Sequence, residues 1–401
     1  MATRITGPRL FDLVEVRTTF AVVDARSLDV VPDGGALAMD AEAPNATTFW
    51  RPGAAAHLVE LHARGAARRM APMQRRMDTA RRKASESLER NGLCLLPGGC
   101  HPWMDPMQAQ IDGPRADLAD RVLAMRAHGR ANGQALRIAL SFRGDAEFTR
   151  LFAAVRMLLP MVPALTAASP IVNGRPNGML ANRAHAAHGP SGRAPGLEGP
   201  VVPEAAFTEE DHYRTINAPL ARSLAEAGAM ELMGHEWADP RAVTASFDTG
   251  MVHLRVADAQ ESTAAGHAVA EMIVAVVRAL VKGRWASSYL QRSWHEHDLT
   301  RILEATVRDA DEAVIGDANY PVMFGLLGQG GITAGKLWQH IFVDLYDGLS
   351  DGTRSHIAHI LEHGCLARRV LRHTGPDPDR ERLRTVYARL AGHVGGSAPF
   401  T

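Results

Sequence analysis

The stretch Glu15-Val16-Arg17-Thr18-Thr19-Phe20-Ala21-Val22-Val23-Asp24 decides the fold class of this 401-residue chain. Its β-branched residues favour an extended strand. A polar turn follows, and residues 28–31 form a short run that ends at a loop containing Pro and Gly. This order predicts a β-hairpin, whose two strands pair in the antiparallel direction.

Further strands and helices are expected outward from this stretch. Residues 135–142 alternate apolar and polar side chains, which indicates a half-buried strand. Other expected strands cover residues 55–62, 93–97 and 251–256, and expected helices cover 70–91, 145–165 and 264–282. Because strands and helices do not alternate regularly, we predict an α+β fold with a curved, mainly antiparallel sheet flanked by helices.

The composition bounds the function classes. Lys+Arg and Asp+Glu both number 44, so the formal net charge is +0 and no field attracts nucleic acid or an anionic membrane. The 3 cysteines form no Cys-x-x-Cys pair, which favours a reducing compartment. The N-terminal residues lack an apolar signal segment, and Glu271 and Arg278 interrupt the longest apolar stretch. We therefore expect a soluble, cytoplasmic protein with neither nucleic-acid nor membrane partners.

The chain is expected to form a single domain over residues 1–401. Its C-terminal part, from about residue 299, has the pattern of helices separated by Gly-rich breaks. Residues 174–203 are dense in Gly and Pro, which predicts a long loop.

A collinear set of motifs carries a family resemblance. The most specific is His101-Pro102-Trp103-Met104-Asp105-Pro106, directly after an expected strand. Others follow in order: residues 55–61, His128-Gly129, Gly174-Arg175, Asn182-Arg183, His235-Glu236-Trp237 and Arg255-Val256. Together, over about residues 11–372, they resemble the glutamate-cysteine ligase and carboxylate-amine ligase family.

The resemblance implies a fold similar to the catalytic domain of glutamine synthetase. It also implies activation of a carboxylate by ATP with magnesium, followed by displacement of phosphate by an amine. ATP and Mg are thus the cofactors expected if ligase activity is retained. The implied catalytic residues are Glu60, His101 and Arg255. The implied substrate or phosphate ligands are Arg17, Asp105, Arg137, Arg175 and Arg183.

The chain departs from the family pattern where magnesium is expected. Arg17 and Thr19 stand where the resemblance implies a glutamate-x-glutamate pair, which would place two carboxylates on one face of a strand. Arg137 and Ala139 replace an implied histidine and asparagine, and His253 replaces an implied glutamate. Arginine carries a fixed positive charge and no acceptor, so it repels a divalent cation. The magnesium-ATP site is therefore expected to be dismantled or rebuilt.

Three functions remain open at this point. The first is a ligase that forms an amide with an altered metal arrangement. The second is a non-catalytic relative that binds a small amino-acid-like ligand or supports a partner, as a homodimer or with an active paralogue. The third is a transition-metal enzyme whose candidate ligands are Glu60, His235, Glu236 and His253.

Each candidate residue also has a structural interpretation. Glu60 lies among apolar neighbours and could be a paired buried carboxylate. His101 and Asp105 could fix a tight loop, and Arg175 and Arg183 could be ordinary solvated side chains.

Overall fold

A computed structural model describes residues 7–40, 47–111, 115–127, 129–188, 197–235, 237–327 and 330–401. Within these residues seven strands form one open sheet in the order β2-β3-β1-β5-β9-β8, and β4 pairs with the end of β1, Ala21–Asp24, on the edge opposite β3. All of the pairings are antiparallel. The strands are β1 Val14–Asp24, β2 Thr48–Pro52, β3 Leu58–Gly65, β4 Leu93–Leu96, β5 Leu136–Ser141, β8 Val243–Ser246 and β9 Met251–Leu254.

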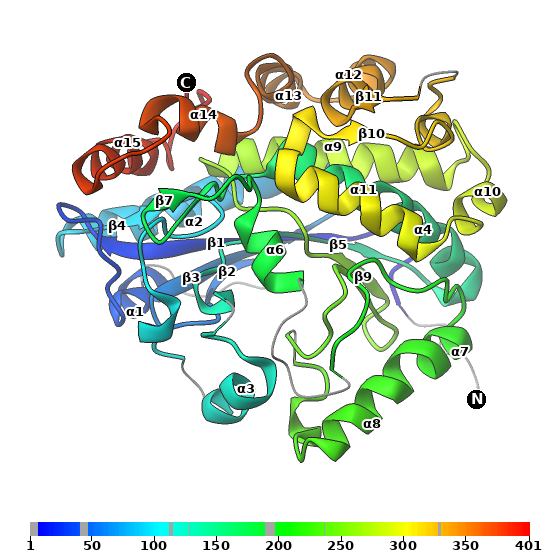
Figure 1. The fold of residues 1–401 in the computed structure, drawn as a ribbon, viewed down its shortest axis with the longest axis horizontal. Helices are drawn as coiled ribbons and strands as arrows, with labels where there is room; N and C mark the ends of the chain where they lie inside the picture. The colour runs from blue at the N-terminus through cyan, green and yellow to red at the C-terminus, as the bar shows by residue number, and fades with distance from the viewer. Residues whose placement is uncertain are drawn as a thin grey trace.

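Helices cover one face of this sheet in layers (Figure 1). The inner layer holds α2 Ala71–Glu89, α4 Gly144–Leu158 and α9 Thr263–Val281. The outer layer holds the C-terminal helices α11 Glu296–Asp309, α12 Ala334–Leu345 and α13 Asp351–His363, with α14 Leu366–Thr374 and α15 Arg380–Gly392 nearer β4. The predicted α+β class with a mainly antiparallel sheet is thus confirmed.

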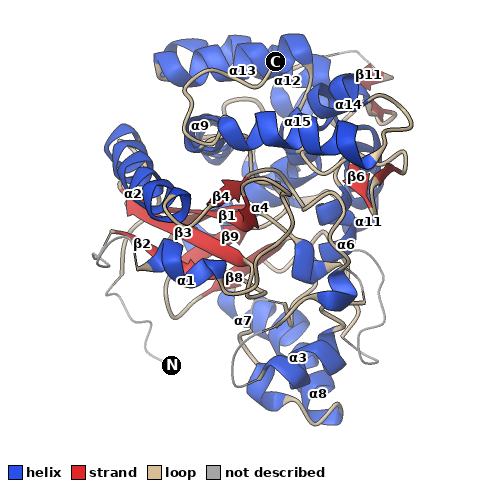
Figure 2. Cartoon of the chain, turned by 90° about the vertical axis from the view of Figure 1, so that its left-hand side faces the viewer, coloured by secondary structure: helices blue, strands red, loops and turns tan. Residues whose placement is uncertain are grey.

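The opposite side of the sheet carries fewer elements. Figure 2 shows α3 Ala116–Leu123, α7 Glu209–His212 and α8 Ala218–Glu226 on the side away from α9. A π-helical turn at Tyr213–Asn217 joins α7 to α8. The remaining helices are α1 Gly34–Met39, α5 Val162–Thr166, α6 Asn182–His188 and α10 Ser288–Arg292. Two small hairpins complete the described strands: β6 Ile171–Val172 with β7 Arg175–Pro176, and β10 Val314–Ile315 with β11 Ile332–Thr333.

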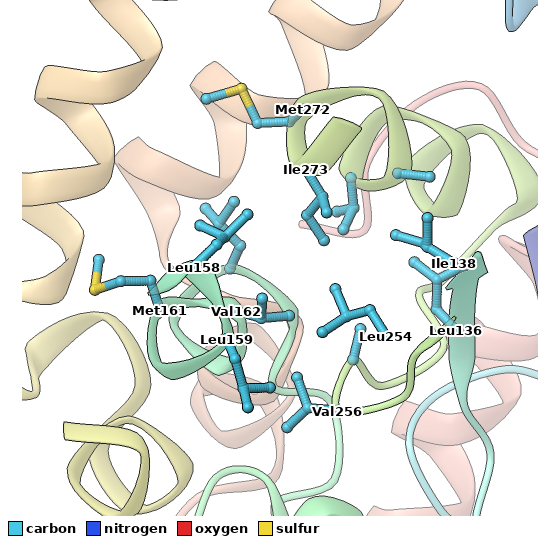
Figure 3. Packing of buried hydrophobic residues seen from close by; sticks show 14 of the residues in the cluster. Leu136, Ile138, Leu158, Leu159, Met161, Val162, Leu254, Val256, Met272 and Ile273 are labelled. Atoms are coloured by element: carbon cyan, nitrogen blue, oxygen red, sulfur yellow. The ribbon is translucent and has the colours of Figure 1, made fainter. Parts of the chain in front are cut away.

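Side-chain alternation divides the sheet into an apolar and a polar face. On β1, Val14, Val16, Phe20 and Val22 are at most 1% exposed and belong to the main hydrophobic core. Figure 3 shows how that core continues through β5, β9 and the end of α4 to α9, with Leu136, Ile138, Leu254, Leu158, Met272 and Ile273 in one cluster. The intervening β1 residues, including Arg17, lie on the other face. We call it the site face and define it by Glu15, Arg17, Glu60, Arg137 and His253.

Two helical segments are long and apolar enough to span a membrane, namely residues 144–166 and Thr263–Val281. Both are mostly buried inside the fold, as expected for core helices of a soluble protein. They cover the helices predicted at 145–165 and 264–282, so those two predictions are confirmed.

Two local predictions need correction. The hairpin after β1 is reduced to one bridge between Val23 and Val30, because β3 and β5 occupy the two edges of β1 over most of its length. The stretch 174–203 is not all loop, since α6 lies within it. Ala184 of α6 is buried and Ala181, just before the helix, is tied to the backbone of Val307, so packing overrides the local Gly/Pro composition.

Candidate functional site

The register of β1 brings the departures from the family pattern together on the site face. Thr19 lies opposite Glu60 of β3, and Arg17 lies opposite both His62 of β3 and Arg137 of β5. Directly opposed residues of antiparallel strands project their side chains to the same face. Arg17 and Thr19, which stand where the resemblance implies two glutamates, therefore lie on the same face as Glu60.

Glu60 is a buried carboxylate that is already neutralised. Its Oε1 lies 3.4 Å from Arg137 Nη1 and accepts a 3.3 Å hydrogen bond from Thr19 Oγ1, while its Oε2 lies 3.0 Å from His62 Nε2. Burial alone would raise the pKa of Glu60, but the charge of Arg137 and the hydrogen bond from His62 outweigh it and lower the pKa to about 2. Glu60 is ionised at neutral pH, and both of its oxygens are engaged.

Arg17 makes a weaker contact at the centre of the site face. Its Nη2 lies 3.4 Å from Glu15 Oε2, and its side chain is 30% exposed. Glu15 is held more tightly by Arg64, whose Nε donates a 2.7 Å hydrogen bond to Oε1. Burial would raise the pKa of Glu15, but Arg64 and Arg17 lower it below its usual value. The stronger partner of Glu15 is thus Arg64, and Arg17 lines two cavities on the site face.

The β9 side of the site face adds His253 and Arg255. His253 lies opposite Ala139 of β5, and burial followed by the charge of Arg17 lowers its pKa to about 4. Arg255 donates a 3.3 Å hydrogen bond from Nη1 to the carbonyl of Asp239. The buried Trp237 ring lies 5.5 Å from the Arg137 guanidinium and 5.9 Å from that of Arg255. Trp237 therefore holds two arginines side by side through cation–π contacts.

Two cavities open on this face and share Arg17 and His235. We call the first the β9 cavity, of about 510 Å³, whose charged lining is Glu15, Glu209, Asp239, Asp248, Arg17, Arg137 and Arg255. We call the second the β2 cavity, of about 450 Å³, whose charged lining is Glu60, Arg17, Arg51 and Arg115. The β9 cavity is mixed in charge, whereas the β2 cavity is dominated by cations.

The donors present on the site face do not fit magnesium. Mg²⁺ prefers carboxylate and phosphate oxygens, and the residues flanking Glu60 are Arg17, Thr19, His62 and Arg137. The predicted transition-metal site with Glu60, His235, Glu236 and His253 stays a prediction. In the described ranges no three His, Cys, Asp or Glu side chains gather closely enough to hold a metal ion. Glu236, the fourth candidate ligand, lies outside the described residues.

The remaining sequence-predicted residues lie away from the two cavities. His101 is buried, its Nε2 lies 2.7 Å from the Leu28 carbonyl, and its Nδ1 accepts a 3.0 Å hydrogen bond from the Met104 amide. Burial lowers the pKa of His101 to about 4. Asp105 caps the 3₁₀ turn at Pro106–Gln108. These contacts fix a loop, which is the structural interpretation of both residues.

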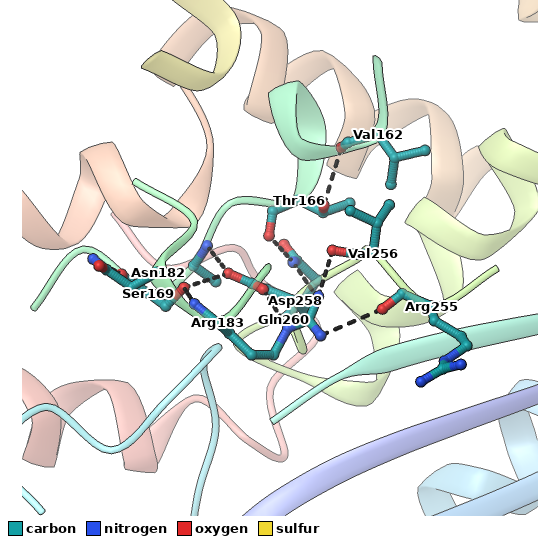
Figure 4. Close-up of polar contacts among 10 residues, drawn as sticks. Val162, Thr166, Ser169, Asn182, Arg183, Arg255, Val256, Asp258 and Gln260 are labelled. Carbon is teal, nitrogen blue, oxygen red and sulfur yellow. Dashed lines mark hydrogen bonds and ion pairs between the residues drawn. The ribbon is translucent and has the colours of Figure 1, made fainter. Parts of the chain in front are cut away.

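Arg175 and Arg183 occupy two different environments. Arg175 is exposed and lines a third, open cavity with Trp103, Asp105 and Arg380. Arg183 is buried next to the segment that follows β9, where its Nε lies 2.6 Å from Asp258 Oδ1 (Figure 4). It also donates to the backbone carbonyls of Arg255 and Val256. The structure therefore does not bring Arg183 to the site face.

Sequence reasoning missed three site residues. Arg51 lies on edge strand β2, which had not been predicted, and Arg115 directly precedes α3. Trp237 was noted only as part of a motif. Nothing in the sequence around Arg51 or Arg115 indicates that either residue lines a cavity. Trp237 could have been predicted as a site residue, because it lies in the same motif as His235.

Comparison with known proteins gives the family. The family model described as glutamate-cysteine ligase family 2 (GCS2) matches residues 52–322, more than half of the chain. A protein of Archaeoglobus fulgidus described as uncharacterized is 28% identical over 193 residues. That alignment covers 47% of this chain and 52% of the relative, so the chain matches about half of the relative's length.

Solved structures show the same fold at low sequence identity. A glutamate–cysteine ligase from Francisella tularensis, in complex with AMP, is similar with a TM-score of 0.64 at 10% identity, over 96% of this chain and 89% of that one. A bifunctional glutathione synthetase from Pasteurella multocida has a TM-score of 0.57 at 10% identity, over 95% of this chain and 52% of that one. These similarities confirm the predicted glutamate-cysteine-ligase-like fold.

Proposed function

The chain belongs to glutamate-cysteine ligase family 2, and we propose that it uses this carboxylate-amine ligase scaffold to bind a small amino-acid-like ligand without magnesium-dependent ATP chemistry. The ligand occupies the β9 cavity. No amide bond is formed at the expense of ATP in this protein.

The state of Glu60 carries this proposal. Phosphoryl transfer from ATP depends on divalent cations that neutralise the developing charge. The Glu60 carboxylate already contacts Thr19, His62 and Arg137. A magnesium ion there would meet the Arg17 and Arg137 guanidiniums instead of two further carboxylates. Losing this charge stabilisation at several strands removes the main source of rate enhancement.

The lining of the β9 cavity supports a zwitterionic ligand. Its guanidiniums, Arg17, Arg137 and Arg255, match a carboxylate, and bidentate arginine–carboxylate pairs are strong and directional. Its acidic residues include Glu15 and Asp239, which match an ammonium group. A volume of about 510 Å³ lies in the usual range for small-molecule sites.

Family membership favours a second candidate, an active ligase with a different metal arrangement. In that case the arginines of the β9 cavity would neutralise phosphates and orient the substrate carboxylate, and Glu60 would be the carboxylate that remains for a metal ion. A similar solved structure, that of the F. tularensis ligase, contains AMP, which supports nucleotide use in such a protein. A supporting role for an active paralogue, or a homodimer, is compatible with either candidate.

Calorimetry and a phosphate-release assay separate the two candidates. The purified protein is titrated with ATP and magnesium, and then with glutamate and other amino acids in the presence of EDTA. Phosphate release is followed with glutamate plus cysteine and with a panel of amines. We expect amino-acid binding without magnesium and no amine-dependent phosphate release. Tight magnesium-ATP binding together with amine-dependent phosphate release would overturn the proposal in favour of the ligase.

A further inference from the structure

The β2 cavity has a charge inventory unlike that of its neighbour. Among the described residues, its lining contains three guanidiniums, from Arg17, Arg51 and Arg115, and one carboxylate, from Glu60. Glu60 is engaged by Arg137 and His62, so it offers little to a ligand cation. The cavity therefore carries an excess of positive charge inside a protein whose formal net charge is +0.

The arginines at the cavity rim are exposed and lack a close carboxylate partner among the described residues. Arg115 makes a 2.5 Å hydrogen bond to the Glu231 carbonyl and a 3.9 Å approach to the Glu231 carboxylate, with both side chains more than half exposed. Exposed pairs of this kind stabilise a protein very little. Arg51 lies over the Phe49 ring at 5.0 Å, and no carboxylate in the described residues pairs with it. Neither guanidinium is therefore neutralised by a close carboxylate, and both are accessible to a bound anion.

The base and wall of the cavity add two features that suit an anion. Arg17, opposite His62 on the sheet, has its single 3.4 Å ion pair to Glu15 and is 30% exposed. Ala116, the first residue of the eight-residue helix α3, lines the wall. The positive end of the helix dipole therefore lies at the cavity, where backbone amides lack intrahelical partners.

We propose that the β2 cavity binds a phosphate or phosphate-ester dianion directly through Arg17, Arg51 and Arg115, without a divalent metal ion. Planar guanidinium groups bind phosphate oxygens in pairs, and three of them supply the charge that a metal would otherwise supply. The site is adjacent to the β9 cavity and shares Arg17 and His235 with it. The proposal does not depend on the β9 cavity binding an amino acid.

Calorimetry in EDTA tests the site with four probes: inorganic phosphate, pyrophosphate, AMP and ATP. We expect at least one probe to bind at millimolar concentration or below and to lose affinity as salt rises. Binding of inorganic phosphate would identify a free-anion site. Binding of AMP or ATP with no binding of phosphate would identify a nucleotide phosphate as the ligand.

A double variant, Arg51→Gln with Arg115→Gln, should raise the Kd of the bound probe about tenfold or more. Both positions are exposed, so folding is expected to persist and is checked by circular dichroism. The matched control is Arg301→Gln on α11, an arginine 63% exposed in its pair with Asp298, which should leave the Kd unchanged.

Three outcomes would overturn the phosphate site. They are no binding of any probe in EDTA, binding that appears only when magnesium is added, and an equal loss of affinity in the Arg301→Gln control. Amino-acid binding measured on the same samples reports the β9 cavity separately. If the protein binds amino acids but no phosphate probe, the phosphate site is wrong. If it binds a phosphate probe but no amino acid, the proposed function of the β9 cavity is wrong.

Discussion

Arginines lie beside carboxylates both on the site face and in the buried network around Asp258, but their contacts differ. On the site face the Arg17–Glu15 and Arg137–Glu60 pairs are both 3.4 Å long, and Arg17 is 30% exposed. In the buried network the Arg183–Asp258 pair is 2.6 Å long, with both side chains at most 2% exposed. A guanidinium near solvent with a long contact can exchange its partner for a ligand. A fully buried one with short contacts cannot, so it stabilises the fold instead.

The network around Asp258 is closely fitted. Asp258 Oδ2 accepts hydrogen bonds from the Ser169 hydroxyl at 2.7 Å and the Ala168 amide at 2.8 Å. A side chain at Gly99 would place its Cβ 2.5 Å from that same oxygen. Glycine at this position is required by the close approach. The network thus joins the loop before His101 to α6 and to the segment after β9.

The largest effect of a single substitution is expected from breaking the buried pair. Arg183→Gln leaves the Asp258 carboxylate buried without its cation, so the free energy of unfolding should fall by about 3–5 kcal/mol. Urea denaturation measures this change. Arg301→Gln, at an exposed pair, should cost less than about 1 kcal/mol. If Arg183→Gln lowers the free energy of unfolding only slightly but greatly weakens ligand binding, the comparison is wrong and Arg183 is a binding residue.

Acid should destabilise the fold through three histidines that are buried while neutral. Burial lowers the pKa of His57, His101 and His253 to about 4, from 6.5 in the unfolded chain. The folded state therefore binds fewer protons between these values, and stability is complete above pH about 6.5 and falls toward pH about 4. Each histidine contributes up to about 1.4 kcal/mol per pH unit.

Urea denaturation at a series of pH values checks this slope. His101 is only 1% exposed and is hydrogen-bonded to the Leu28 carbonyl. Replacing it in His101→Gln removes one titrating group, so the dependence of stability on pH should become less steep. The matched control is His297→Gln, at an exposed position of α11. A stability that is constant between pH about 6.5 and about 4 would contradict the burial argument.

Restoring carboxylates on the site face should convert its preference from anions to cations. Arg17→Glu combined with Thr19→Glu places two carboxylates beside Glu60, and magnesium affinity should rise about tenfold or more. Calorimetric titration with magnesium measures the gain. The single variant Thr19→Glu, which keeps Arg17, is the matched control and should gain less. Unchanged affinity in the double variant would show that these side chains do not share a site with Glu60.

The smallest effect is expected from the aromatic wall of the β9 cavity. Trp237→Leu removes the cation–π contacts to Arg137 and Arg255, each worth about 0.5–1 kcal/mol. Amino-acid affinity should weaken a few fold because the two guanidiniums lose their alignment. Phe49→Leu, under Arg51 of the β2 cavity, is the comparison variant and should leave amino-acid affinity unchanged.

Much of the scaffold was predictable because its signals are local. Period-two alternation predicted the β5 strand, and apolar helical patterns predicted α4 and α9. The same alternation placed Arg17 and Thr19 on one face of β1. The hairpin after residue 24 and the loop over residues 174–203 were predicted less well, because neighbouring strands and the packing of α6 decide them.

The sequence by itself determined the family, the α+β class and the identity of the side chains that replace the implied magnesium carboxylates. Alternation along one strand is a local property, so no distant contact was needed to predict it. Only the tertiary structure decided that Arg183 is buried against Asp258 while Arg17 stays accessible. It also decided that Arg51 and Arg115, 64 residues apart in the sequence, meet at one cavity. Burial and partner choice depend on long-range packing, which a single stretch of sequence does not encode.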